Sequence, residues 1–215
     1  MNSSFDPGLP GPGRVEAFSD GVLAIAITLL VLEIHVPQLV VAASAREAWV
    51  ALVTLAPKLL SYLLSFLFIA VFWVNHHGFF RLIRHVDVAL LWLNIMLLLA
   101  LSFIPFPTAM IGEYPRNPLA LALFSVVLML AGIVFNLMWR HSESHGLFHS
   151  GISLAMVGRA TVLGLIGPAL YGLAAVVAFV FPLATWALFI VVPLIYTFRG
   201  HEPVMKQPEQ GGIQS

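Results

Sequence analysis

Four residues near the start of the chain combine a base, an aromatic ring, a hydroxyl and a carboxylate at close spacing. They are Arg14, Phe18, Ser19 and Asp20, and they lead directly into an apolar run in which the next charge is Glu33. An ionisable side chain inside a bilayer is costly unless it is paired, so intramembrane charges are candidates for function. This stretch is therefore the first candidate site.

A helical wheel of residues 15–35 separates an apolar stripe from the polar residues. Within about 60° of Ile25 lie the members of this stripe: Phe18, Leu29 and Leu32, with Thr28 at its edge. Such a stripe either packs in the core of a helical bundle, as most do, or faces a partner outside the subunit. Both interpretations remain open at this point.

Ser19 and Asp20 project about 120° to 140° away from Ile25 on the same wheel. We expect both side chains to turn into the bundle and to find partners there, because an unsatisfied charge at that depth is costly. Asp20 could also form a structural ion pair with Arg14 or with a histidine.

A second polar group ends the second apolar segment and consists of Trp73, Asn75, His76 and His77. These side chains supply hydrogen-bond donors, and Asp20 supplies acceptors, so a network across the helices is chemically natural. Adjacent histidines on a helix point about 100° apart and chelate a metal poorly. A proton-sensing role for them stays possible, because imidazole titrates near pH 6.5.

His141, His145 and His149 recur at four-residue intervals and would align for Zn²⁺ on a single helix. Gly146 and the neighbouring serines favour a solvated connector, and the metal alternative is left open.

Three polar residues lie inside apolar segments, where such groups commonly form hydrogen bonds between helices. They are Asn94, Ser102 and Asn136.

The composition is that of an integral membrane protein, because 60% of the residues are hydrophobic and 9% are charged. The zero net charge gives no indication of a nucleic-acid partner, and the absence of cysteine excludes disulfides. No carboxylate pair, nucleophile elbow or phosphate-binding loop is present, so we expect no enzyme and no metal or cofactor.

A bilayer core of about 30 Å requires roughly 20 mostly apolar residues per helix, which predicts six spans. They are 15–35, 48–74, 86–106, 118–140, 157–180 and 182–199. We expect a six-helix transmembrane domain over 14–199 between flexible tails at 1–13 and 200–215. Residues 48–56 should be a partly exposed extension, Lys58 should snorkel to the interface, and Pro168 and Pro193 should kink their helices.

Lys and Arg collect at one side of the predicted topology, seven against three, which places both termini in the cytoplasm. The protein is then a multi-pass protein of the plasma membrane. The Phe-Ser-Asp pattern occurs once, so a symmetric pathway would need several copies of the chain.

The quoted motifs resemble those of the endosomal/lysosomal potassium channel family (transmembrane protein 175). The resemblance rests on the Arg14 to Asp20 pattern, on Phe72-Trp73-Val-Asn75-His76-His77, and on the stretch from Ile104 to Tyr114. It implies an all-α potassium channel, modestly selective over sodium, in which the first helix of each subunit lines a central pore in a homotetramer.

The resemblance also implies roles for individual residues. Ile25 would form the tightest constriction, Leu29 and Leu32 would lie one and two turns further along, and Thr28 would add a hydroxyl ring tied to selectivity. A network that holds the pore helix would comprise Arg14, Phe18, Ser19 and Asp20 with Trp73, Asn75 and His77. No cofactor is implied beyond permeant K⁺.

Two other functions remain to be weighed. A proton-coupled transporter could use Asp20 with His76 and His77 as a relay, and a membrane scaffold would pass no ions.

Overall fold

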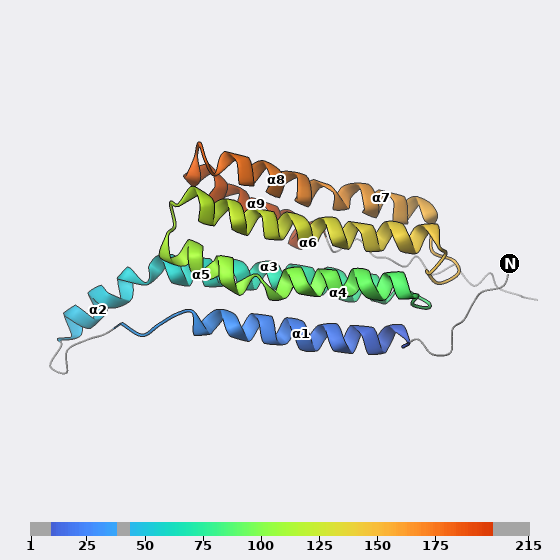
Figure 1. Cartoon of the computed structure of the whole chain (residues 1–215), viewed down its shortest axis with the longest axis horizontal. Helices are drawn as coiled ribbons and strands as arrows, with labels where there is room; N and C mark the ends of the chain where they lie inside the picture. Colours follow the sequence, from blue (N-terminus) through green and yellow to red (C-terminus); the bar gives the residue numbers. More distant parts are fainter. Residues whose placement is uncertain (1–9, 38–43, 200–215) are drawn as a thin grey trace, which may run out of the picture.

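The computed structural model describes residues 10–37 and 44–199, and within these ranges the chain is an elongated bundle of helices (Figure 1). In chain order the helices are α1 (Pro12–Leu32), α2 (Ala45–Thr54), α3 (Ala56–Phe80), α4 (Val88–Ser102), α5 (Pro105–Glu113), α6 (Pro118–Ser144), α7 (Leu154–Gly164), α8 (Ile166–Val177) and α9 (Pro182–Arg199). The predicted all-α membrane fold is confirmed. Of the predicted tails, 1–9 and 200–215 lie outside the described residues, and α1 already begins at Pro12.

Five stretches of the described chain are long and apolar enough to cross a membrane. They are α1, α3, the α4–α5 pair, α6 and the α7–α8 pair. The sixth predicted span corresponds to α9, whose apolar part, Pro182–Tyr196, is shorter than the other five.

Proline explains why three of the predicted spans, the second, third and fifth, are each built from two helices. Proline has no N–H to donate to the carbonyl four residues earlier, so helices break just before it. Pro57 follows the break at Leu55, Pro105 follows the end of α4, and Pro168 follows the break at Leu165. The predicted boundaries at 48–74, 86–106 and 157–180 are corrected accordingly, with α3 reaching Phe80 and α5 reaching Glu113.

The short helix α2 projects beyond the bundle at the end opposite to the α1 N-terminus (Figure 1). Its start is fixed by a capping box, in which the Ser44 side chain accepts from the Glu47 amide and the Glu47 carboxylate accepts from the Ser44 amide. None of its side chains is buried. This agrees with the prediction of an exposed extension before the second span.

An aromatic cluster joins α3 to the second half of the chain. The Phe68 ring contacts Phe124 of α6, Tyr171 of α8 and Phe189 of α9, with ring centroids 5.6, 5.8 and 6.3 Å apart. Such edge-to-face contacts add to the energy of burial. This aromatic part of the core lies among α3, α6, α8 and α9, and α1 lies at the edge of the bundle (Figure 1).

The α3–α4 and α6–α7 connections lie at the end of the bundle where α1 begins, which we call the basic end. Two backbone hydrogen bonds join them, from the Arg84 amide to the Leu147 carbonyl and from the His149 amide to the Leu82 carbonyl. The arginines at this end are Arg14, Arg81, Arg84, Arg140 and Arg159, whereas Arg46, Lys58 and Arg116 lie toward the other end. The charge asymmetry predicted from the sequence is thus present along the bundle.

Asp87 clamps the start of α4 to the end of α6. One carboxylate oxygen accepts from the Leu90 amide at 2.7 Å, and the other lies 2.8 Å from Nε2 of His141. Partial burial raises the pKa of Asp87, but these two hydrogen bonds outweigh it and the net pKa lies below the ordinary value of 3.8. The His145 ring stacks on His141, with centroids 4.1 Å apart.

We expect Asp87→Asn to lower the melting temperature of the purified protein at pH 7 by a few degrees. Asparagine keeps the helix cap, so the variant loses only the contact of a partly exposed charge with His141, about 1 kcal/mol or less. Because the folded-state pKa of Asp87 is depressed, the stabilisation is present above pH 3.8 and is lost as the pH falls below it. The melting temperatures of the wild type and Asp87→Asn should therefore become equal at a pH well below 3.8.

Glu143→Gln is the matched control, since Glu143 lies on the same helix end as His141 and its carboxylate makes no hydrogen bond or ion pair within the described part of the chain. It should match the wild type at every pH. An equal effect of both substitutions would show that the Asp87–His141 contact is not the stabilising one.

Candidate functional site: the exposed stripe of α1 and its anchors

The apolar stripe predicted on α1 is exposed along its whole length. The exposed fractions are 61% for Phe18, 62% for Ile25, 42% for Leu29 and 68% for Leu32, and Thr28 is exposed as well. The interpretation of this stripe as the core of the subunit's own bundle is therefore wrong. Its partner, whether lipid, a pathway or a second subunit, lies outside the chain.

The opposite face of α1 is the one that packs against the bundle. Its buried residues are Val15, Ser19, Leu23, Ala26 and Leu30. They recur at three- and four-residue intervals, which is the spacing of one helix face. The helix is thus fixed on one side and bare on the other.

Ser19 anchors this buried face through a chain of hydrogen bonds. Its hydroxyl donates to the Val15 carbonyl and accepts from the Asn94 amide nitrogen at 2.9 Å. The Asn94 amide oxygen in turn lies 2.8 Å from Nε2 of His76. Three helices, α1, α4 and α3, are joined at one buried point.

This pattern assigns the protonation of His76. Because Asn94 uses its N–H toward Ser19, its oxygen must accept, and Nε2 of His76 must carry the proton. Nδ1 of His76 is buried without a hydrogen-bond partner in the described chain. A second proton there would have no acceptor, so the geometry favours a neutral, structural imidazole.

Two further contacts hold α1 to α3, one on each side of the Ser19 anchor along the helix. The Trp73 indole N–H donates to the Asp20 carboxylate at 2.8 Å, and Nδ1 of His77 contacts the Glu16 carboxylate. The rings of Trp73 and His77 stack, with centroids 6.1 Å apart. The α1–α3 contact is therefore charged and partly exposed, in contrast to the buried contact at Ser19.

Three members of the predicted network do not take part in it. The Arg14 side chain is exposed and makes no hydrogen bond or ion pair among the described residues, so the alternative of an Arg14–Asp20 ion pair is not seen within the subunit. The Phe18 ring is exposed, and the Asn75 amide donates to the Val71 carbonyl of its own helix at 2.7 Å. Within one subunit these three side chains therefore make no contact between α1 and α3, and their place in the network stays a prediction.

Glu16 and Asn94 complete the contacts and were not assigned to the network from the sequence. Asn94 could be recognised from the sequence, because it is a lone amide in an apolar helix. Its predicted hydrogen bond between helices is confirmed, and so is that of Asn136, which donates to the Thr161 carbonyl. The Ser102 hydroxyl instead donates to the Leu99 carbonyl of its own helix.

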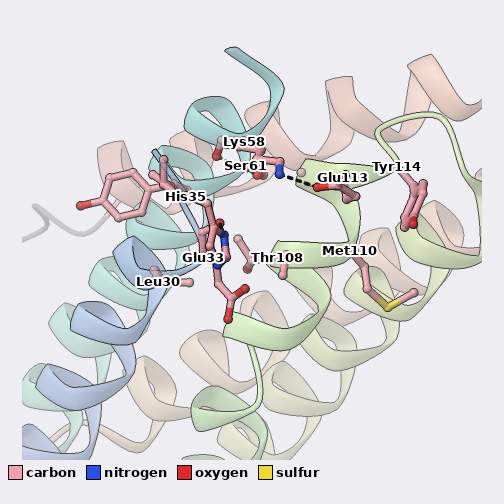
Figure 2. Close-up of a pocket in the computed structure, with 13 residues that line it drawn as sticks. Leu30, Glu33, His35, Lys58, Ser61, Thr108, Met110, Glu113 and Tyr114 are labelled. Carbon is pink, nitrogen blue, oxygen red and sulfur yellow. Dashed lines mark hydrogen bonds and ion pairs between the residues drawn. The ribbon is translucent and has the colours of Figure 1, made fainter. Parts of the chain in front are cut away.

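The end of α1 opposite to the basic end borders a cavity of about 270 Å³, shown in Figure 2. Lys58 of α3 and Glu113 of α5 form an ion pair across its rim, and Glu33 and His35 lie beside it. Lys58 is thus held by a carboxylate rather than simply extended toward the interface. The lining of this cavity thus carries two carboxylates, Glu33 and Glu113, and one ammonium group, Lys58.

Known proteins with similar sequences and folds are membrane channels. A potassium channel of Streptomyces collinus is 40% identical over 196 residues, which cover 87% of this chain and 92% of that protein. The crystal structure of a lysosomal potassium-selective channel TMEM175 homolog from Chamaesiphon minutus superposes with a TM-score of 0.78 at 36% identity, over 89% of this chain and 98% of that one. These likenesses place the protein among the ion channels and not among the enzymes.

The family itself follows from two matches. Residues 14–105 match the model of the endosomal/lysosomal potassium channel TMEM175 family. The human endosomal/lysosomal proton channel TMEM175 is 31% identical over 175 residues, which cover 77% of this chain and 35% of the human protein. With the Streptomyces relative, these matches show that the chain belongs to the TMEM175 family.

We expect Asn94→Ala to lower the free energy of unfolding by about 2–4 kcal/mol, because buried groups of both Ser19 and His76 lose their partner. Ser102→Ala is the matched control on the same helix, since its hydroxyl contacts only its own backbone. Thermal unfolding of both purified variants measures the difference. Equal melting temperatures would show that the buried chain of hydrogen bonds does not hold α1 in place.

Proposed function

We propose that the protein is a potassium-permeable cation channel in which α1 of each of four identical subunits lines a central pore. The observation that carries the proposal is the exposed apolar stripe of α1 opposite a face that is firmly anchored. A helix that only contacted lipid would need no anchoring by Ser19, Asp20 and Glu16 at defined positions. A helix that shapes a pore must be fixed in rotation.

A single copy of α1 cannot enclose a path, because it lies at the edge of the bundle (Figure 1). The chain contains one such helix, so a closed ring requires several copies related by a rotation axis. Four is the number of copies that the family resemblance implies. The names of the bacterial relatives, potassium channels, support K⁺ as the permeant ion.

Ile25 is proposed as the constriction, with Leu29 and Leu32 further along the same line. A narrow ring of isoleucine side chains offers no oxygen ligands, so it obstructs ions by excluding water and forces them to shed hydration. Selectivity for K⁺ over Na⁺ is then modest, because no ring of carbonyl oxygens replaces the lost water. The carboxylate of Glu33, just after the end of α1, would raise the local concentration of cations, whereas that of Glu113 is neutralised by Lys58.

Thr28 is proposed as the polar ring next to the constriction. Its hydroxyl proton is already used, since Oγ1 donates to the Ile25 carbonyl at 2.9 Å. The oxygen lone pairs are therefore left to face a passing cation. This is the arrangement expected of a weak ligand ring.

The proposal includes the membrane arrangement predicted from the sequence. The helices cross the lipid bilayer of the plasma membrane, with the basic end and both termini on the cytoplasmic side. No nucleic-acid partner is involved.

The contacts favour a channel over the proton-coupled transporter. Asp20 accepts from Trp73, whereas His76 is bound to Asn94, and His77 is bound to Glu16. The three groups of the supposed relay are held in separate contacts and do not form one hydrogen-bonded line. A transporter would show saturable flux that collapses in Asp20→Asn, whereas a channel gives currents that rise linearly with driving force.

Ile25→Asn should keep or increase the current and should lower the K⁺/Na⁺ permeability ratio, because an amide ring lets ions pass with their water. The measurement is a bilayer recording of reconstituted protein under bi-ionic conditions. Val31→Asn is the matched control, since Val31 is also exposed on α1 but lies about 120° from Ile25. Unchanged permeability ratios in Ile25→Asn would rule out Ile25 as the constriction.

Thr28→Val should preserve the shape of the ring and remove its oxygen ligands. We expect the K⁺/Na⁺ permeability ratio to fall by about 2- to 10-fold, the effect of losing a net hydrogen-bond-sized interaction of up to about 1.4 kcal/mol. Thr28→Ser, which keeps the hydroxyl, should retain the ratio. Equal ratios in the valine and serine variants would contradict a role for the oxygen.

A further inference from the structure

A second cavity lies on the far side of α3 from α1 and has a volume of about 260 Å³. It is enclosed by α3, α6, α7, α8 and α9, and no residue of α1 lines it. The cavity is therefore separate from the proposed pore. It lies at membrane depth, where the α7–α8 pair is interrupted.

The phenol group of Tyr196 lies at the interruption between α7 and α8. Leu165 ends α7, and the Tyr196 hydroxyl of α9 accepts from the Gly167 amide at 2.9 Å and donates to the Leu163 carbonyl at 3.3 Å. These two backbone groups would bond to each other in a continuous helix. The phenol thus replaces a missing helical hydrogen bond and holds the break open.

Glycines keep side chains away from this break. A Cβ on Gly164 would lie 2.9 Å from the Asn136 amide nitrogen, and one on Gly167 would lie 2.9 Å from the Tyr196 hydroxyl. Gly132 of α6 is in contact with the Pro168 ring, because a Cβ there would lie 2.7 Å from Cγ of that proline. The close backbone approach is specified by small residues and is not a packing defect.

Two amides give the cavity its polar character. Asn136 has an exposed fraction of only 3%, and its amide N–H donates to the Thr161 carbonyl at 2.6 Å. Asn75 likewise uses its N–H, toward Val71. Within the described chain neither amide oxygen has a hydrogen-bond donor. Pro168 also leaves the Gly164 carbonyl without its helical donor.

The rest of the wall is aromatic and uncharged. Rings of Phe72, Phe135, Trp139 and Tyr171 line the cavity, and no acidic or basic side chain does. A charged ligand would have no counter-charge at this depth and would be excluded. A neutral ring with one hydrogen-bond donor matches both the walls and the unused acceptors.

We propose that this cavity is an intramembrane binding site for a small uncharged aromatic alcohol, of the size of a substituted phenol, whose hydroxyl donates to Asn136 or Asn75. The volume lies just below the range of about 300–1,000 Å³ of sites for drug-sized molecules, which limits the ligand to a single ring. The site is independent of the pore, because it shares none of the α1 stripe residues.

The test uses 4-bromophenol, because bromine quenches the fluorescence of a tryptophan in contact with it. Titration of the purified full-length protein in nanodiscs should show a saturable loss of fluorescence, which should be absent in Trp139→Phe. Ala160→Phe, which fills the cavity from α7, should also remove it. Quenching that rises linearly and equally in the wild type and Trp139→Phe would mean partition into lipid only and would overturn the proposal.

The hydrogen bond is tested with 4-bromoanisole, in which a methyl ether replaces the hydroxyl. We expect its affinity to be about 5- to 10-fold weaker, and we expect Asn136→Leu to remove the preference for the phenol. Asn75→Leu serves as a second variant if Asn136→Leu fails to fold, since Asn75 bonds only to its own helix. Equal affinities of the two probes for the wild type would overturn the proposed role of the amide oxygens. Quenching of Trp139 by lipids with brominated chains that 4-methylphenol, a phenol without bromine, cannot relieve would show a lipid site and would overturn the proposal.

Discussion

The structure depends on one physical constraint, which is that polar side chains within a membrane protein must find partners inside the protein. On α1 this constraint acts on one face only. Ser19 is bonded to Asn94, and Asn94 to His76, so the rotation of α1 about its own axis is fixed at a buried point. The exposed stripe with Ile25 at its centre then points in a defined direction without any contact of its own.

The same constraint accounts for the broken helices. Each break before Pro57, Pro105 or Pro168 frees a carbonyl that needs a donor or a place to be solvated. The first lies where α2 leaves the bundle, and the third is bridged by the phenol of Tyr196. The break before Pro57 thus lies at an exposed end, the Leu101 carbonyl before Pro105 accepts from the Ile104 amide, and the Tyr196 hydroxyl joins Leu163 to Gly167 across the third break.

The sequence predicted the helical class, the approximate spans and the apolar stripe of α1, because these follow from hydropathy and from the period of the helix. The 100° wheel is enough to separate Ile25 from Ser19. It could not show whether the stripe was internal core, since an apolar face looks the same whether it meets a neighbour or remains bare. Only the packing of α1 at the edge of the bundle settled that question against the internal core.

The partners of the polar groups were harder to predict, because they depend on which helices become neighbours and at what height. Trp73 and His77 do meet α1, but Asn75 on the same turn faces the other side of α3, and Arg14 lies beyond the last contact. Glu16 was not assigned from the sequence, because a carboxylate in the first turns of a helix is usually solvated. Asn94 supplied the missing link from α4, a helix whose one other polar residue, Ser102, bonds only to its own backbone.

The position of Asn94 in the chain has a consequence for biosynthesis. Its contact with Ser19 joins residues that are 75 positions apart, so α1 leaves the ribosome well before its anchor exists. During that interval the Ser19 hydroxyl lacks its donor from α4, and the Asp20 carboxylate lacks the Trp73 indole until α3 has been made. The nascent helix must therefore wait near the membrane insertion machinery or another polar environment, and its final orientation is set only when the third span arrives.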